Sequence, residues 1–111
     1  MSEPTFDYEI VDSLKPGVTS KATITRVEIA KAGDIYKNKA KNPDQKIVVI
    51  YGKVERDGWE GRLRTFSLPP TKQITAKTVM AQFKQRYKQF PKVGMKGDVV
   101  TDANGYWKMI P

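Results

Sequence analysis

The first clear hydrophobic pattern lies in residues 18–30, VTSKATITRVEIA, where apolar and polar side chains alternate. The apolar positions of the first half carry even numbers, whereas Val27 and Ile29 carry odd numbers. A period of two is typical of a half-buried strand, and one extra residue in a strand reverses the parity. The pattern therefore predicts a long, bent first strand with a β-bulge near Thr25 and Arg26.

Four further strands are predicted after it. Residues 46–55, KIVVIYGKVE, are apolar on both faces at their start, which favours a central strand. Residues 59–68 follow the hairpin signal Asp57-Gly58 and end before a Pro-Pro pair. Residues 94–102 and 106–110 are joined by the turn signal Ala-Asn-Gly.

Residues 75–90 form the one predicted helix, because their apolar side chains recur at three- and four-residue spacing. Thr75 is the expected N-cap, and Pro91 ends the helix. Residues 31–46 contain five lysines among glycine, asparagine and proline, which predicts a long polar loop or a loosely paired hairpin.

The order β-β-β-α-β-β matches the OB-fold. The fold class predicted is therefore mainly β: an OB-fold five-stranded Greek-key barrel with one α-helix between strands 3 and 4. We assign residues 1–17 to an acidic N-terminal arm and residues 18–111 to the OB-fold domain. A family resemblance lies in the segments KIVVIYGKVERDGWEGRLRTFSL and KVGMKGDVVTDANGYWKMI, with the helix between them. In these segments the chain resembles single-strand-binding OB domains of the replication-protein-A-like or phage and archaeal type.

The amino-acid composition limits which catalytic and metal sites the chain can form. The chain has no histidine and no cysteine, so disulfides, thiolate metal sites and histidine acid–base catalysis are excluded. Only carboxylate metal chemistry remains open, and the carboxylates show no metal motif. We expect no enzyme activity, no metal and no cofactor. No apolar run approaches the ~20 residues of a membrane helix and no signal peptide is recognisable, so we expect a cytoplasmic protein without a membrane partner.

The charge is unevenly distributed. The net charge of the 111 residues is +8. Residues 1–20 carry four acidic residues against one lysine, a charge of −3, so residues 21–111 carry +11. A basic body favours a polyanionic partner, although a solubilising surface has the same composition.

An OB barrel binds oligonucleotides on the face of its strands 2 and 3. By parity, Tyr51 and Lys53 share one face of the second strand, and Arg62, Arg64 and Phe66 share one face of the third. Cations beside rings suit a single strand, because cations meet phosphates and rings stack on bases. The alternatives are that the arginines are only the solvated side and that a bulge turns Phe66 into the core.

The loops beside this face add further candidates. Trp59 either stacks on a base at the rim or covers the edge of the core. Trp107 is expected in the core, which turns Tyr106 outward beside Lys108. In the first loop we expect a phosphate clamp, or else a solubilising surface, made by Tyr36, Lys37, Lys39 and Lys41.

The function expected from these features is non-enzymatic binding of single-stranded DNA with little sequence preference. The alternatives are RNA binding, a protein-interaction module and a carboxylate-metal nuclease. The acidic arm is a candidate contact for a protein partner or a homo-oligomer, and it is also a candidate competitor for the basic groove.

Overall fold

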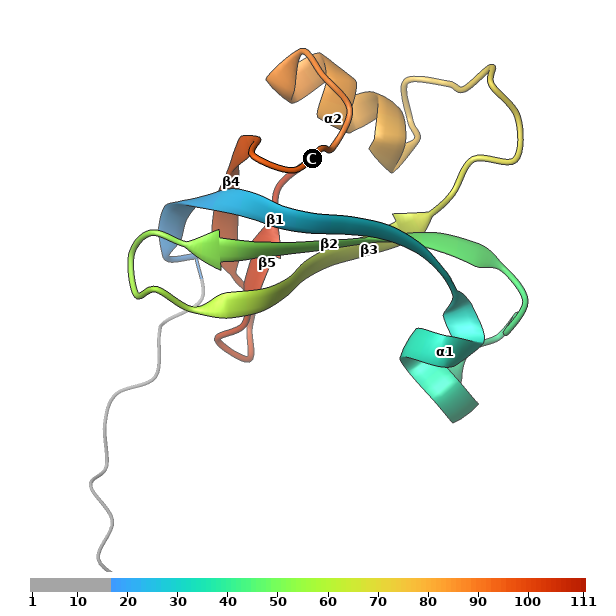
Figure 1. The fold of residues 1–111 in the computed structure, drawn as a ribbon, viewed down its shortest axis with the longest axis horizontal. Helices are drawn as coiled ribbons and strands as arrows, with labels where there is room; N and C mark the ends of the chain where they lie inside the picture. The colour runs from blue at the N-terminus through green and yellow to red at the C-terminus, as the bar shows by residue number, and fades with distance from the viewer. Residues whose placement is uncertain (1–16) are drawn as a thin grey trace, which may run out of the picture.

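The computed structural model describes residues 17–111, so the predicted N-terminal arm lies outside the described residues except for Gly17. Five antiparallel strands form one sheet in the order β3-β2-β1-β4-β5 (Figure 1). The strands are β1 (Thr19–Lys31), β2 (Lys46–Val54), β3 (Glu60–Ser67), β4 (Lys96–Thr101) and β5 (Trp107–Met109).

The two outermost strands of this sheet, β3 and β5, meet and nearly close a barrel. Nη1 of Arg64 on β3 donates to the carbonyl of Met109 on β5 at 3.1 Å. The neighbours of each strand are those of a five-stranded Greek-key barrel, and a helix, α2 (Val79–Tyr87), connects β3 to β4. The predicted fold class, mainly β with an OB-like barrel, is confirmed.

Strand β1 bends because it takes part in two pairings. Its first half pairs with β4, and residues from Ala22 onward pair with β2. The β1–β2 register shifts between Ile24 and Arg26, which confirms the predicted bulge at Thr25. Gly52 on β2 lets the backbones of β1 and β2 approach closely at this bend, since a Cβ there would lie 2.6 Å from the carbonyl oxygen of Thr23.

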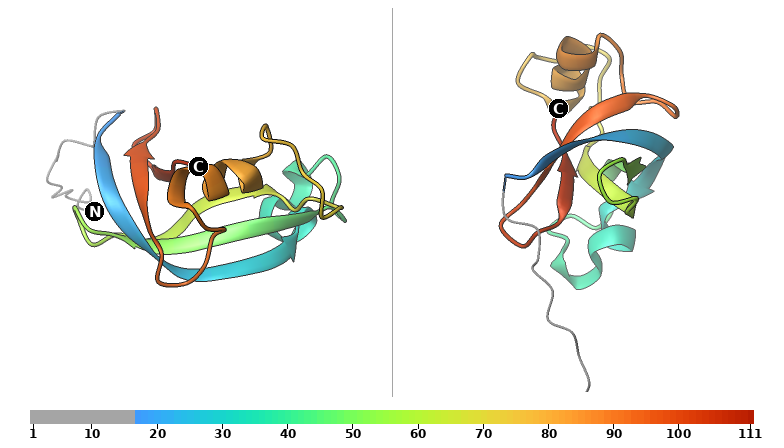
Figure 2. Two further views of the ribbon diagram at one scale, coloured as in Figure 1. Left: turned by 90° about the horizontal axis from the view of Figure 1, so that it is seen from above. Right: turned by 90° about the vertical axis from the view of Figure 1, so that its left-hand side faces the viewer.

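Helix α2 lies against one side of the barrel (Figures 1 and 2), and its inner face packs on the core. Phe83 of α2 is fully buried, and its ring stacks on Phe66 with centroids 5.6 Å apart. Trp107 lies in the same cluster, as predicted. The other buried members are Ala22, Ile24, Val48, Ile50, Val54, Leu63, Met95, Val99 and Met109.

Helix α2 is shorter than predicted. It begins after Thr78, whose Oγ1 accepts the N–H of Ala81 at 3.3 Å, so Thr78 and not Thr75 is the N-cap. It ends at Lys88, which has a left-handed φ of 63°, before Pro91 is reached. The prediction failed at both ends because the apolar period of the sequence runs on past the residues that cap the helix.

Residues 31–46 are more ordered than the predicted loop. They contain the short helix α1 (Ala32–Tyr36) and the 3₁₀ turn η1 (Lys37–Lys39). Ala32 packs with Ile47 and Val49 in a small cluster on the outside of the barrel. This contact explains why the start of β2 is apolar on both faces. No helix within residues 17–111 has the length and apolarity needed to cross a membrane.

Candidate nucleic-acid interface

Two exposed aromatic rings near β3 lie beside one hollow. Trp59 is 38% exposed and follows the β2–β3 hairpin, whereas Tyr106 is 68% exposed and follows the β4–β5 turn. A hollow of about 400 Å³ is lined by these two residues together with Arg62, Asp102 and Trp107. The two turns therefore bring together rings that are 47 positions apart in the sequence.

Two aspartates hold these turns in place. Oδ1 of Asp57 accepts the N–H of Trp59 at 3.0 Å, and its Oδ2 accepts the indole N–H of Trp107 at 2.9 Å. Partial burial alone would raise the pKa of Asp57, but the hydrogen bonds from Trp107 and Trp59 hold this pKa below its ordinary value. Oδ1 of Asp102 accepts the N–H groups of Asn104 and Tyr106 at 2.9 and 3.0 Å.

The Trp59 ring lies directly over the backbone of β3. A Cβ at Gly61 would lie 2.8 Å from two atoms of the Trp59 indole. The ring therefore packs on the strand at the one position where a side chain is absent. The indole covers this part of β3 and is still exposed, so its stacking on a base stays a prediction.

Arg62 and Arg64 have different surroundings although they are two residues apart. Arg62 is exposed, and it lines both the Trp59–Tyr106 hollow and a second hollow of about 310 Å³ that Lys108 also lines. Arg64 is half-buried at the seam of the barrel, where burial lowers its pKa and Met109 accepts its hydrogen bond. Arg64 therefore serves first to close the barrel, and Arg62 is the arginine that is free to meet a ligand.

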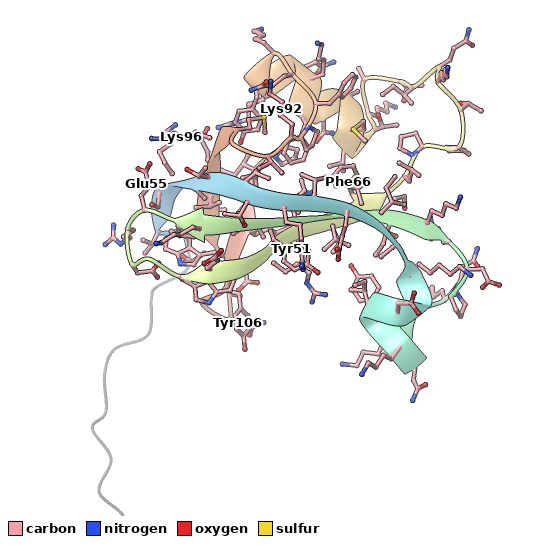
Figure 3. All side chains as sticks on the ribbon, in the orientation of Figure 1. Tyr51, Glu55, Phe66, Lys92, Lys96 and Tyr106 are labelled. Carbon is pink, nitrogen blue, oxygen red and sulfur yellow. The ribbon has the colours of Figure 1, made fainter. Side chains whose placement is uncertain are left out.

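Phe66 was predicted to lie on this face beside the arginines, but it lies in the core. It is only 8% exposed and belongs to the core beside Phe83. The β2–β3 register shifts between Ile50 and Tyr51, which leaves Leu63 as an extra residue on β3. This bulge turns both Leu63 and Phe66 inward, so Phe66 does not share a face with Arg62. In Figure 3 Phe66 lies on the α2 side of the sheet, whereas Tyr51 and Tyr106 lie on the opposite side.

Tyr51 lies opposite Arg62 in the β2–β3 register, on the outside of the barrel. The guanidinium carbon of Arg26 lies 4.0 Å from the centroid of the Tyr51 ring, and the Tyr51 hydroxyl donates to Glu28 at 3.0 Å. Arg26 and Glu28 also form an ion pair at 3.6 Å. One face of the Tyr51 ring is thus already occupied by Arg26, a residue that the sequence analysis did not select.

The predicted phosphate clamp is carried by α1, η1 and the following turn. The hydroxyl of Tyr36 bonds to that of Thr65 on β3, which places α1 beside the outer surface of the strand. Lys37 and Lys39 belong to η1, and Lys41 follows it; all three are exposed, as is Lys53 on β2. None of the described ion pairs of residues 17–111 uses Arg62 or one of these lysines.

We use the name candidate face for the outer surface of β2 and β3 with the hairpin 55–59 and the turn 102–106. It gathers Tyr51, Lys53, Trp59, Arg62, Tyr106 and Lys108, with Tyr36 at its end next to Thr65. Phe66 is not part of it, and Arg64 reaches it only at the seam. Within residues 17–111 no three carboxylates lie close enough to hold a metal ion.

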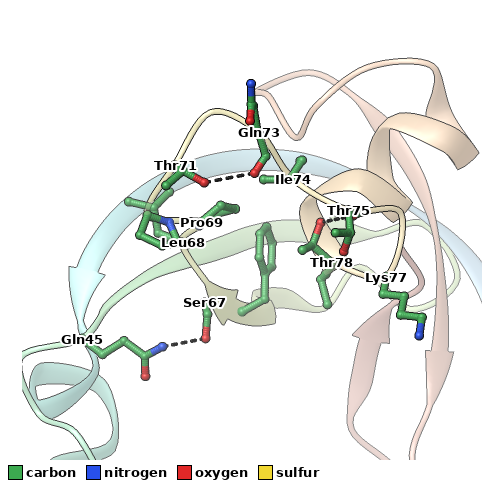
Figure 4. Close-up of a pocket in the computed structure, with 13 residues that line it drawn as sticks. Gln45, Ser67, Leu68, Pro69, Thr71, Gln73, Ile74, Thr75, Lys77 and Thr78 are labelled. Carbon is green, nitrogen blue, oxygen red and sulfur yellow. Dashed lines mark hydrogen bonds between the residues drawn. The ribbon is translucent and has the colours of Figure 1, made fainter.

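A larger hollow, of about 520 Å³, lies between the end of β3 and the start of α2 (Figure 4). Its polar groups are engaged with each other: Gln45 donates to Ser67 at 2.8 Å, and Thr78 donates to the carbonyl of Thr75 at 2.9 Å. Lys77 is the one charged residue in its lining. This hollow therefore lacks the cations and exposed rings that mark the candidate face.

No known protein family matches the chain, and neither the characterised proteins nor the solved structures contain a significant match.

Proposed function

We propose that the protein binds single-stranded nucleic acid, DNA in the first place, through the candidate face. The observation that carries the proposal is the grouping of two exposed rings, Trp59 and Tyr106, with the exposed cations Arg62 and Lys108 around adjoining hollows. Single strands expose both unstacked bases and phosphates, so they need both kinds of group.

The charge of the chain supports a polyanionic ligand. Residues 21–111 carry +11. The cations of the candidate face, Lys53, Arg62 and Lys108, form no ion pair among the described residues. Unpaired surface cations release counterions when they meet phosphates, which favours binding at low salt. No observation on this face selects one base, so we expect little sequence preference.

The test is a fluorescence-anisotropy titration of a labelled oligo(dT) of about 20 nucleotides, which exceeds the ~4–16 nucleotides that one OB fold covers. It is run at low and high salt, with matched RNA and duplex DNA as competitors. The proposal expects salt-sensitive binding that prefers the single strand. An absence of binding at low salt would refute it, and preference for RNA would reassign the ligand.

Two charge-matched double variants separate the candidate face from the general charge. Arg62→Ala/Lys108→Ala removes two cations from the face, whereas Lys72→Ala/Lys92→Ala removes two exposed cations from the connections before and after α2. For two lost phosphate contacts, the slope of log K against log salt should fall by about 1.4, since each contact contributes ~0.7 for single strands. Equal effects of both double variants would show that binding does not use this face.

A further inference from the structure

Strand β1 has an open edge over its second half. On the side away from β2, its first half pairs with β4, and Ile24 then bonds to Met95 and Gly94 at 2.9 and 2.8 Å. Beyond Ile24, no other described strand pairs with this edge. In the left view of Figure 2, β1 is the outermost ribbon between the α2–β4 connection and α1.

The alternation of the backbone identifies the groups on this edge. The N–H of Ala32 donates to Gln45, just before β2, at 2.8 Å. Since alternate residues of an antiparallel strand point their N–H and C=O groups to the same neighbour, Ala30 and Glu28 face β2. The N–H and C=O groups of Val27 and Ile29, and the N–H of Lys31, therefore point to the open edge.

Ile29 adds an exposed apolar side chain to this unpaired edge. Its side chain is 62% exposed, although Val27, of the same parity, packs against the core. An open edge with an exposed apolar side chain is the feature that natural sheets usually block, because it pairs readily with another strand. Here no proline interrupts residues 25–31.

We propose that this edge pairs with the same edge of a second copy of the chain, antiparallel, about a two-fold axis at Ile29. Each Ile29 N–H then donates to the Ile29 carbonyl of the other copy, and each Lys31 N–H donates to the Val27 carbonyl of the other copy. Directly opposite residues share a face, so the two Ile29 side chains cover each other. Glu28 comes to lie opposite Ala30, without a like charge.

The neighbouring registers are worse. An axis at Ala30 places each Ile29 opposite Lys31 of the other copy and so separates the two Ile29 side chains. An axis at Glu28 places the two Glu28 carboxylates opposite each other, and an axis at Lys31 does the same with two ammonium groups. An axis at Val27 places Ala30 of one copy against Ile24 of the other, where Met95 and Gly94 already occupy the backbone groups. The axis at Ile29 is therefore the register that joins apolar side chains and free backbone groups.

This pairing is independent of the proposed function. Tyr51 and Arg26 lie on the opposite side of the sheet from Ile29, by parity across the bulge and by the Arg26–Tyr51 contact. The candidate face stays open in the dimer, so the dimer does not need nucleic acid to form and does not block it.

The absence of cysteine from the chain gives a direct test. In Ile29→Cys the only two thiols of the dimer belong to directly opposite, hydrogen-bonded residues, whose Cα atoms are about 5.5 Å apart. A disulfide needs Cα atoms ~4.4–6.8 Å apart. We expect Ile29→Cys to form a disulfide-linked dimer on mild oxidation, seen by non-reducing electrophoresis.

Two single-cysteine controls carry the same chemistry at other places. Val93→Cys is matched in exposure, since Val93 is also 62% exposed, but it lies outside the strand. Lys31→Cys tests the register, because the two residues 31 would be roughly 13 Å apart, four residues along the strand. Cross-linking of Ile29→Cys no faster than that of Val93→Cys would overturn the proposal, and fast cross-linking of Lys31→Cys would overturn this register.

Sedimentation equilibrium tests the unmodified chain. A pair of five-residue strands is a small interface, so association should rise with concentration. We expect Ile29→Lys to abolish it, with a circular dichroism spectrum unchanged because the side chain is exposed. A wild type that stays monomeric at the highest soluble concentration, or a dimer that Ile29→Lys leaves intact, contradicts the proposal. Failure of the chain to bind nucleic acid would not contradict this pairing, because the candidate face takes no part in it.

Discussion

The indole N–H of Trp107 donates to Oδ2 of Asp57 at 2.9 Å and so ties the β2–β3 hairpin to the last strand. The other oxygen of the same carboxylate accepts the N–H of Trp59 at 3.0 Å. One side chain thus fixes an exposed ring relative to β5, which directly follows Tyr106. The alignment of the two rings on the candidate face depends on this carboxylate.

We expect Asp57→Ala to weaken single-strand binding although it removes a negative charge. Loss of the two hydrogen bonds should also lower the free energy of unfolding by about 1 kcal/mol, because the group is exposed. Anisotropy titration and urea denaturation measure the two effects. Asp44→Ala is the control for charge, since Asp44 is exposed. Equal, tighter binding by both variants would mean that Asp57 does not position Trp59.

The two arginines of β3 should separate stability from binding. Arg64→Ala leaves the Met109 carbonyl at the seam without its partner, so we expect a loss of roughly 1–3 kcal/mol in the free energy of unfolding. Arg62→Ala should leave stability unchanged and weaken binding of oligo(dT). Chemical denaturation and anisotropy on the same two variants decide it. The opposite assignment of effects would mean that Arg62 is the structural arginine.

Two glycines give a similar contrast. A Cβ at Gly52 meets the Thr23 carbonyl and Leu63 at 2.6 Å, and backbone cannot move aside, so Gly52→Ala should cost about 1–3 kcal/mol of stability. A Cβ at Gly61 meets only the Trp59 ring, which can swing away. Gly61→Ala should therefore change binding and the tryptophan emission more than stability. A Gly61→Ala variant with wild-type affinity would argue against a role for the Trp59 ring.

The strands could be predicted because alternation survives wherever one face of a strand is buried. The bulge of β1 was visible as a change of parity, with Val27 and Ile29 out of phase with the first half. Helix α1 was not predicted, because five residues are too few to show a period and its apolar contacts, to Ile47 and Val49, are made in three dimensions.

The candidate site could be predicted only in part for a related reason. Trp59 and Tyr106 follow turn signals that are readable in the sequence. For Phe66 the sequence left both the face and the core open, because nothing in it marks the bulge at Leu63, which arises from the pairing of β3 with β2. The role of Asp57 depends on Trp107, 50 positions away, and only its local bond to Trp59 has a sequence signal, that of an Asx-turn.

Stability should fall in acid partly through Asp98. The pKa of Asp98 is lowered first by the hydrogen bond from Lys21. Burial opposes this effect, and the hydrogen bond from Arg86 lowers the pKa further. A carboxylate whose pKa is lower in the folded state stabilises the fold above its unfolded pKa, near 3.9, and loses this contribution as pH falls through the folded value. Asp98→Asn should lower stability at pH 7 and flatten its decrease below about pH 4. Urea denaturation across pH 2–7 measures this. A parallel shift at every pH would exclude the ionised carboxylate as the cause.

The acidic N-terminal residues should compete with nucleic acid. The N–H of Gly17 donates to the carbonyl of Thr101 at 3.0 Å. Gly17 therefore lies beside the residue that precedes Asp102, and Asp102 lines the Trp59–Tyr106 hollow. A charge of −3 is thereby tethered beside cations without partners among the described residues, and a tether raises its local concentration.

Deletion of residues 1–15 should therefore tighten binding of oligo(dT) at low salt, and the gain should shrink at high salt because the competition is electrostatic. A full-length variant with Glu3, Asp7, Glu9 and Asp12 changed to their amides separates charge from length. If charge is the cause, both proteins bind more tightly than wild type by a similar factor. Unchanged or weaker binding after deletion would show that these residues do not compete for the candidate face, while a gain from deletion alone would assign the competition to the apolar residues Phe6 and Tyr8.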